Sequence, residues 1–178
     1  MVRAPSDPPR VPLLIELVLM KRKHVRDVLM IEREVYPRPW SAALFFSEIG
    51  QRKTRYYVCA MHGKDLIGYG GLMVHDDEGH ITTIAVDPAY QHGGVGTRIL
   101  LNLVEEARAR DARTIALEVR VANWPAQRLY AWFGFRPVGI RKNYYAETGE
   151  DALVMWIDDA QSAEITRRVA TIRMAVGR

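Results

Sequence analysis

Apolar residues recur at helical spacing in two segments near the N-terminus. Across residues 24–35, apolar and charged positions alternate at intervals of three and four, which predicts a helix that the following prolines end. Ser41 suits the N-cap position of a second, short helix over residues 42–49. Residues 13–20 have the pattern of a strand. We therefore expect one strand followed by two helices.

The period of the pattern changes to two after these helices. Three strands are predicted over residues 55–61, 66–74 and 80–86, and short polar turns join them into an antiparallel meander. Glycines in the middle strand indicate a bulge or a close backbone approach. A long helix over residues 95–110 and a strand over residues 114–119 follow. This strand–helix–strand order predicts a parallel, right-handed connection.

The remaining segments complete the predicted sheet. A shorter helix is expected over residues 125–133, with Gly134 at its C-terminal end. Residues 135–141 and 152–158 have the pattern of strands that bracket a polar loop. The expected fold class is α/β (α+β), with a mixed, mostly antiparallel central sheet of six to seven strands flanked by about four helices.

The chain divides into one predicted domain and two extensions. Residues 1–10 are rich in proline and arginine, which predicts a disordered arm. The domain covers residues 11–158, and the apolar spacing in residues 159–178 predicts a helical C-terminal extension. The sequence has neither the pattern of a signal peptide nor an apolar run of membrane-spanning length. We therefore expect a cytoplasmic protein that does not contact membranes.

Composition and charge narrow the classes of function. The single cysteine, Cys59, excludes an internal disulfide framework, and its neighbours indicate a buried strand position. The five histidines lack the spacing of metal ligands, so we expect no metal. The formal net charge is +4, but the basic residues are scattered along the chain. Direct binding to nucleic acid is therefore not expected.

A glycine-rich turn between a strand and a helix is the most informative motif. In residues 91–96, Gln-His-Gly-Gly-Val-Gly, consecutive backbone N–H groups can point at an anion with the helix dipole behind them. A P-loop is excluded because no Gly-Lys-Ser/Thr follows. A dinucleotide fingerprint is excluded because an antiparallel meander precedes the turn. A pyrophosphate cradle in a mixed sheet remains.

The same turn resembles the Q/R-x-x-G-x-G/A motif of the GNAT N-acetyltransferase superfamily, and it follows Ile-Ala-Val-Asp-Pro as in that family. The chain is similar to its RimI branch, the ribosomal-protein alanine N-acetyltransferases, over residues 13–158. The matching segments are short but occur in the expected order: Pro39–Ser41, Leu117–Arg120, Asn123, Leu129–Tyr130, Gly134–Phe135 and Asn143–Tyr145. The resemblance implies splayed parallel strands at the cofactor site and acetyl-CoA as the co-substrate.

The resemblance also implies which residues bind the two substrates. Peptide would enter beside Trp40, Tyr144 and Tyr145. Arg38 departs from the family pattern, in which an apolar residue is common, and this bears on peptide preference. His92 stands where arginine is frequent, which bears on cofactor affinity. The residues implied for acetyl-CoA are Ile84, Ala85, Val86, Gln91, His92, Gly93, Gly94, Val95, Gly96, Thr97 and Asn123.

Two side chains are candidates for the chemistry of acetyl transfer. Strand alternation places Glu118 with Ala116, on the face away from Leu117, and a carboxylate there can remove a proton from an amine. The alternative is a solvated glutamate paired with an arginine. Tyr130 can donate a proton to the CoA sulfur, because a phenol with a pKa near 10 is protonated at neutral pH. The alternative for Tyr130 is a core aromatic residue.

The choice of amine rests on how readily each amine loses its proton. An α-amine with a pKa of about 8 is neutral in roughly a tenth of molecules at neutral pH, and a lysine amine in well under one in a thousand. We therefore expect acetylation of a protein N-terminus, with a ribosomal protein as the implied partner and a monomeric enzyme. The alternatives are a lysine or small-molecule acetyltransferase on the same fold, and a non-catalytic CoA- or ribosome-binding module.

Overall fold

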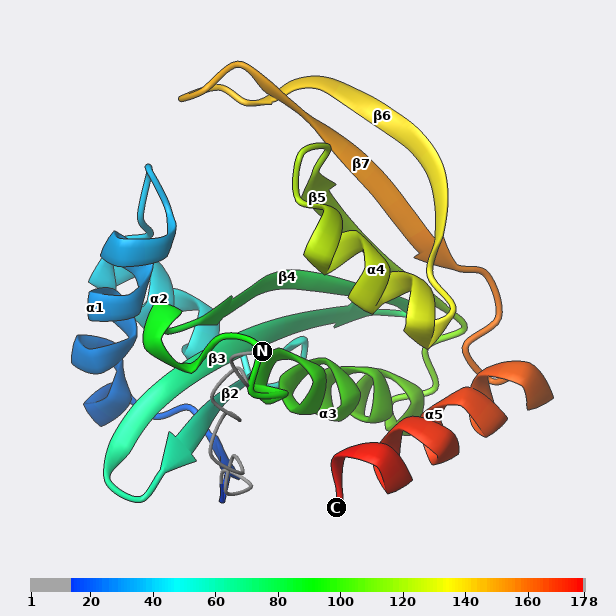
Figure 1. The fold of residues 1–178 in the computed structure, drawn as a ribbon, viewed down its shortest axis with the longest axis horizontal. Helices are drawn as coiled ribbons and strands as arrows, with labels where there is room; N and C mark the ends of the chain where they lie inside the picture. Colours follow the sequence, from blue (N-terminus) through cyan, green and yellow to red (C-terminus); the bar gives the residue numbers. More distant parts are fainter. Residues whose placement is uncertain (1–13, 178) are drawn as a thin grey trace, which may run out of the picture.

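The computed structural model describes residues 14–177, which contain a single mixed sheet and five α-helices (Figure 1). The predicted arm over residues 1–10 lies outside the described residues. The strands are β1 (Glu16–Leu19), β2 (Arg55–His62), β3 (Asp65–His75), β4 (Glu78–Val86), β5 (Thr114–Arg120), β6 (Arg136–Tyr145) and β7 (Glu150–Ile157). The α-helices are α1 (Val25–Val35), α2 (Ala42–Gly50), α3 (Val95–Ala109), α4 (Trp124–Phe133) and α5 (Ala163–Val176).

The seven strands follow the order β1-β2-β3-β4-β5-β7-β6, and every neighbouring pair is antiparallel except β4 and β5. The predicted fold class is confirmed, including the parallel connection through α3. Two short 3-10 helices, Arg22–His24 and Pro88–Tyr90, precede α1 and the glycine-rich turn. No helix between residues 14 and 177 is both long and apolar enough to span a membrane.

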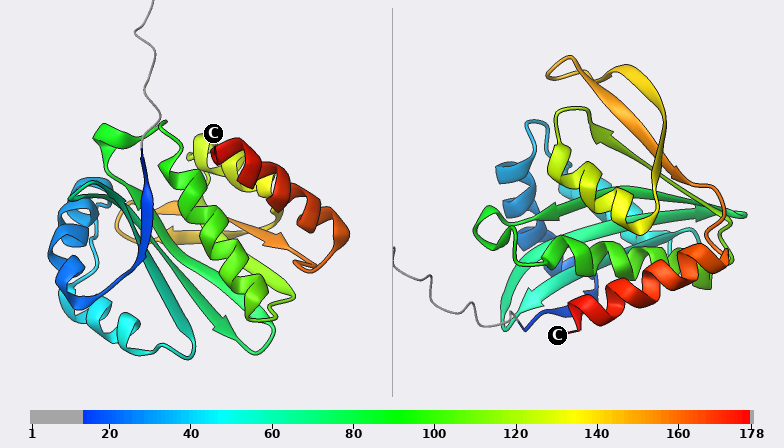
Figure 2. Two further views of the ribbon diagram at one scale, coloured as in Figure 1. Left: turned by 90° about the horizontal axis from the view of Figure 1, so that it is seen from below. Right: turned by 45° about the vertical axis from the view of Figure 1, so that its right-hand side comes forward.

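The helices cover the two faces of the sheet in separate groups (Figure 2). Helices α1 and α2 pack on one face, where Val28, Phe45 and the buried Cys59 belong to one apolar cluster. Helices α3, α4 and α5 contribute to a larger cluster that includes Leu103 and Phe133. The sheet therefore separates two apolar layers, and its edges and ends remain available for a site.

Glycine residues in β3 make room for neighbouring side chains. A register shift between β3 and β4 leaves Thr82 as an extra residue opposite Gly71 and Leu72. A Cβ added at Gly71 would lie 2.2 Å from the ring of Tyr57 and 2.7 Å from the Thr82 hydroxyl. The predicted bulge and close approach are therefore both confirmed at this position, because only glycine leaves room for the tyrosine ring.

Strands β4 and β5 pair over only three residues each, Glu78–His80 with Thr114–Ala116. No further pairing between these two strands occurs in the described part of the chain. Beyond His80, β5 continues its ladder with β7 on its other side. The predicted splay of the two parallel strands is confirmed. It leaves the backbone of β4 beyond His80 without a strand partner on the side that faces β5.

The C-terminal hairpin is longer than the sequence predicted. Strand β6 extends to Tyr145 and β7 begins at Glu150, so Tyr144 and Tyr145 lie at the end of a strand and not in a loop. Asp151 stabilises this extension by accepting hydrogen bonds from Lys142 Nζ at 2.8 Å and from the Asn143 backbone N–H at 2.9 Å. These contacts join residues that the polar local sequence would assign to a loop.

Helix α5 lies against the rest of the molecule along its apolar face. The Ser162 hydroxyl caps its first turn by accepting a hydrogen bond from the Ile165 backbone N–H at 3.3 Å. Ile165, Val169 and Ile172 are buried in the cluster shared with α3 and α4. The last segment of the chain is therefore part of the core.

Candidate active site

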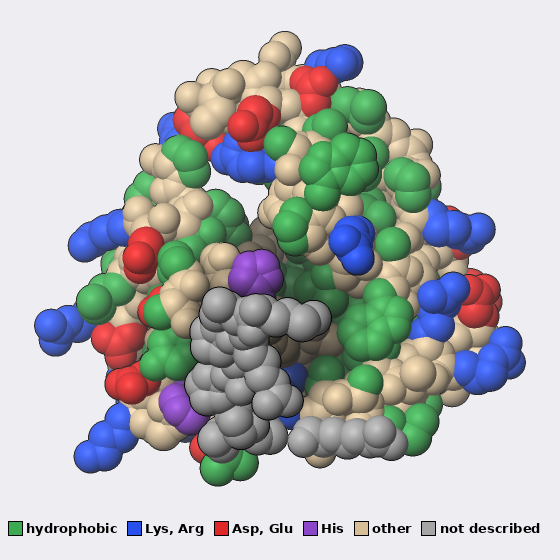
Figure 3. Space-filling model, viewed as in Figure 1, with side chains coloured by type: hydrophobic (Ala, Val, Ile, Leu, Met, Phe, Trp, Pro, Cys, Tyr) green, Lys and Arg blue, Asp and Glu red, His purple; other side chains and the backbone are tan. Residues whose placement is uncertain are grey.

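A cavity of about 530 Å³ lies where β4 and β5 diverge. Its walls come from α1 and the α1–α2 loop, from β4 and β5, from α4, and from the end of the β6–β7 hairpin. The space-filling view shows an opening beneath that hairpin (Figure 3). The cavity therefore draws on segments that are far apart in the sequence.

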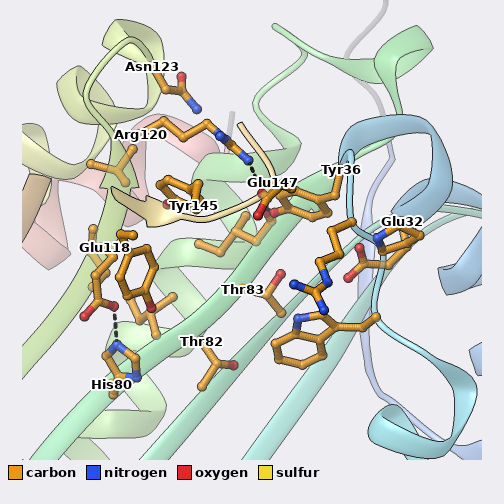
Figure 4. A pocket seen from close by; sticks show the side chains of 18 of the residues that line it. Glu32, Tyr36, His80, Thr82, Thr83, Glu118, Arg120, Asn123, Tyr145 and Glu147 are labelled. Carbon is orange, nitrogen blue, oxygen red and sulfur yellow. Dashed lines mark hydrogen bonds and ion pairs between the residues drawn. The ribbon is translucent and has the colours of Figure 1, made fainter. Parts of the chain in front are cut away.

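Glu118 lies in this cavity and is paired with two basic side chains. Its Oε2 lies 2.6 Å from His80 Nε2 (Figure 4). Its Oε1 lies 3.3 Å from Arg141 Nη1. Only 9% of the Glu118 side chain is exposed. The hydrogen bond with His80 is the main cause that lowers the pKa of Glu118, with a further contribution from Arg141, while burial opposes both. The group is therefore a carboxylate at neutral pH.

Tyr130 lies on α4 and lines the same cavity. Its ring packs edge-to-face against Phe135, with centroids 6.0 Å apart. Within residues 14–177 its hydroxyl has no hydrogen-bond partner. Burial raises the pKa of Tyr130 well above its ordinary value of 10. The phenol is therefore protonated and free to donate a hydrogen bond into the cavity.

The glycine-rich turn leaves the N-terminus of α3 open. Gly94 occupies the N-cap position with φ of +80°, and no side chain caps the helix. An added Cβ at Gly94 would meet no atom within 4 Å, so the backbone faces open space. The first N–H groups of a helix have no partner within the helix. These groups, together with the helix dipole, suit a phosphate group.

Other residues implied for the cofactor have partners of their own. Gln91 Nε2 donates to the Val86 carbonyl at 3.3 Å and holds the turn against the end of β4. The Asn123 side-chain oxygen caps α4 by accepting from the Ala126 N–H at 3.2 Å, which leaves its amide nitrogen available. Tyr36 donates to the Ile84 carbonyl at 2.8 Å.

The three residues expected beside the peptide, Trp40, Tyr144 and Tyr145, all line the cavity. The two tyrosine rings meet edge to face, with centroids 5.1 Å apart. The Arg120 guanidinium lies 3.9 Å from the centroid of the Tyr145 ring and also forms an ion pair with Glu147 at 2.9 Å. A cation from β5 therefore fixes the end of the hairpin over the cavity.

Sequence reasoning did not single out several residues of the cavity. In the sequence His80 is one of five scattered histidines, and its pairing with Glu118 depends on the register of two parallel strands. Arg120 belongs to a segment that resembles the family, but the motif does not indicate what its side chain contacts. Glu32 lies on α1 with 1% of its surface exposed, and its position in the apolar stripe of that helix was the available signal. The part of the chain between residues 14 and 177 contains no cluster of three or more side chains suited to a metal ion.

Comparisons with known proteins identify relatives over most of the chain. The acetyltransferase (GNAT) family matches residues 25–135. The putative [ribosomal protein bS18]-alanine N-acetyltransferase of Bacillus subtilis is 39% identical over 138 residues, which cover 78% of this chain and 91% of that protein. The [ribosomal protein bS18]-alanine N-acetyltransferase of Escherichia coli K12 is 38% identical over 127 residues, covering 70% and 84%. The crystal structure of the ribosomal-protein-S18-alanine N-acetyltransferase from E. coli has a TM-score of 0.75 at 29% identity, covering 85% of this chain and 97% of that one.

Proposed function

The chain belongs to the acetyltransferase (GNAT) family and is an N-acetyltransferase, and we propose that it transfers the acetyl group of acetyl-CoA to the α-amine of a protein N-terminus. One observation carries this proposal. The Glu118 carboxylate and the Tyr130 hydroxyl line a single cavity at the point where β4 and β5 separate. A proton acceptor and a proton donor are thus available beside one exposed strand edge.

Acetyl-CoA would supply an acetyl group activated as a thioester. The open N-terminus of α3, with residues 92–97, would hold its pyrophosphate. The backbone of residues 84–86 and the free amide nitrogen of Asn123 would bind the remainder of the acetyl-CoA molecule. The fit rests on the uncapped helix, the open space at Gly94 and the exposed edge of β4.

The side chains divide the proton transfers between them. Glu118 accepts a proton from the substrate amine, directly or through water, and the neutral nitrogen then bonds to the acetyl carbon. As the carbon–sulfur bond breaks, Tyr130 gives its proton to the sulfur and takes up the second proton that the nitrogen loses. The first proton, held by Glu118, then passes to solvent. His80 is a positioning residue, since its 2.6 Å hydrogen bond fixes the carboxylate.

The lowered pKa of Glu118 favours an α-amine as the substrate. A carboxylate with a depressed pKa is a weak base, so it serves best an amine that is already partly neutral. An α-amine meets this condition at neutral pH to a far greater extent than a lysine side chain does. The names of the two relatives specify alanine acetylation of ribosomal protein bS18, which supports the N-terminus of a ribosomal protein as the partner.

Mass spectrometry tests this proposal directly. The enzyme is incubated with acetyl-CoA and a peptide that begins with Ala-Arg and carries an internal lysine, and the acetylated nitrogen is located. We expect acetylation of the α-amine, and a rate reduced about 10²-fold or more in Tyr130→Phe, because the general acid is lost. Acetyl on the lysine alone would contradict the proposed substrate. An unchanged rate in Tyr130→Phe would contradict the role of the phenol.

A further inference from the structure

Three glutamates line the cavity, and they differ in how their charge is compensated. Glu118 is paired with a histidine and an arginine. Glu147 forms an ion pair with Arg120 at 2.9 Å. Within residues 14–177, Glu32 forms no ion pair with any cation. It is therefore the one described carboxylate of the cavity whose charge is uncompensated.

Glu32 is also the most deeply buried of the three. Only 1% of its surface is exposed, and its Oε2 has no hydrogen-bond partner in the described part of the chain. Burial raises the pKa of Glu32, and the nearby Tyr69 hydroxyl and Trp40 backbone offset that rise only in part. The Tyr69 hydroxyl is close enough to lower this pKa but does not meet hydrogen-bond geometry, so it too is buried without a partner. Leaving such groups unsatisfied is costly, so a side chain retained in this state points to a ligand.

Glu32 lies across the cavity from Glu118. It reaches the cavity from α1, whereas Glu118 reaches it from β5, with Thr82 and Thr83 of β4 between them (Figure 4). Tyr36 follows the last residue of α1, and its hydroxyl donates a hydrogen bond to the Ile84 carbonyl on β4. Glu32 therefore lies on the wall formed by α1, beside the strand edge proposed to hold the acetyl donor.

We propose that Glu32 is the counter-ion that binds the positively charged α-ammonium group of the incoming N-terminus. This inference rests on the proposed function, because that function defines the substrate. An α-amine arrives mainly as an ammonium ion at neutral pH, and it must leave water to enter the cavity. A carboxylate with a free oxygen accepts a hydrogen bond from that ammonium, and each group compensates the other. Glu118 cannot do this equally well, since it already has two basic partners.

Steady-state kinetics with a matched pair of variants test the inference. Glu32→Gln removes the charge and keeps the shape, and Glu34→Gln makes the same change at an exposed position of the same helix. The peptide that begins with Ala-Arg is titrated at saturating acetyl-CoA. We expect the KM for peptide to rise about tenfold or more in Glu32→Gln, because a charged hydrogen bond is lost. We expect the affinity for acetyl-CoA to stay within about twofold and Tm to stay unchanged or rise.

A second measurement needs no variant. The binding of the peptide to the CoA-bound wild-type enzyme is compared with that of an analogue in which a hydroxyl group replaces the α-amine. We expect the amine form to bind about tenfold more tightly or better. Equal binding of the two peptides, or equal KM values in Glu32→Gln and Glu34→Gln, would overturn the inference while peptide acetylation by the wild type left the proposed function standing. Failure of the wild type to acetylate any α-amine would overturn both.

Discussion

At the scale of single residues, the charge of Glu118 links the chemistry of the site to the stability of the fold. The hydrogen bond with His80, assisted by Arg141, holds its pKa below the ordinary value of 4.5. A carboxylate whose pKa is lower in the folded state stabilises the fold above its unfolded pKa. That stabilisation is lost as the pH falls through the folded pKa.

The prediction concerns acid unfolding. The free energy of unfolding of the wild type should exceed that of Glu118→Gln by a constant amount from neutral pH down to about pH 5, and the difference should shrink below that. Denaturant titrations at several pH values measure it, with Glu34→Gln, at an exposed position of α1, as a control for loss of one charge. A difference that stays constant down to about pH 3 would show that Glu118 is not held ionised by its partners.

Some residues of the site were predictable because their placement depends on local periodicity. Alternation along β5 places Glu118 on the other face of the strand from the buried Leu117, as the sequence indicates. The partner of Glu118, His80, was not predictable, because it depends on the point at which two parallel strands stop pairing. Glu32 did leave a local signal. It shares a helical stripe with Val28 and Ile31, and a charge in an apolar stripe calls for a partner.

At the scale of elements, the sequence predicted those with strong periodicity and underestimated the last hairpin. The predicted helix over residues 95–110 corresponds to α3 within one residue at its C-terminal end. The end of β6 has the polar sequence of a loop. It forms a strand because Asp151, a residue of the next strand, binds Lys142 and Asn143. Contacts of this kind, between strands, leave no periodic signature in the local sequence.

The turn before α3 carries the prediction at this scale. Gly94→Ala places a Cβ on a residue with φ of +80°, which should cost about 1–2 kcal/mol of stability, and it directs the Cβ into the open space proposed for phosphate. We also expect weaker binding of acetyl-CoA, measured by calorimetry. Gly149→Ala, at φ of +68° in the β6–β7 turn and equally open, should lose similar stability with no change in acetyl-CoA affinity. Equal affinities in both variants would contradict the proposed phosphate cradle.

At the scale of the whole molecule, a single sheet joins two apolar layers. The sequence indicated the number of strands, but the order in which β7 lies between β5 and β6 could not be read from it. It also gave the apolar spacing in residues 159–178 without indicating what that face would cover. In the structure α5 covers part of the larger cluster, which makes the tail a component of the core.

Helix α5 should therefore unfold together with the rest of the molecule, in one cooperative transition. Ile172→Ala removes a fully buried side chain and should cost about 2–5 kcal/mol, whereas Met174→Ala, at a residue that is 64% exposed, should change stability by less than about 0.5 kcal/mol. Unfolding followed by far-ultraviolet circular dichroism and by tryptophan fluorescence should give coincident transitions in both variants. Loss of α5 in a separate, earlier transition would contradict the inclusion of the tail in one cooperative unit.

The cavity gathers its walls from α1, β4, β5, α4 and the last hairpin, and this has a consequence in time. Contacts between segments distant in sequence form only after the chain has lost the entropy of closing long loops. We therefore expect the site to assemble late, after the local helices and the early meander have formed. Recovered activity during refolding should lag behind recovered helix content, and a newly synthesised chain should acquire its activity only once its final strands are in place.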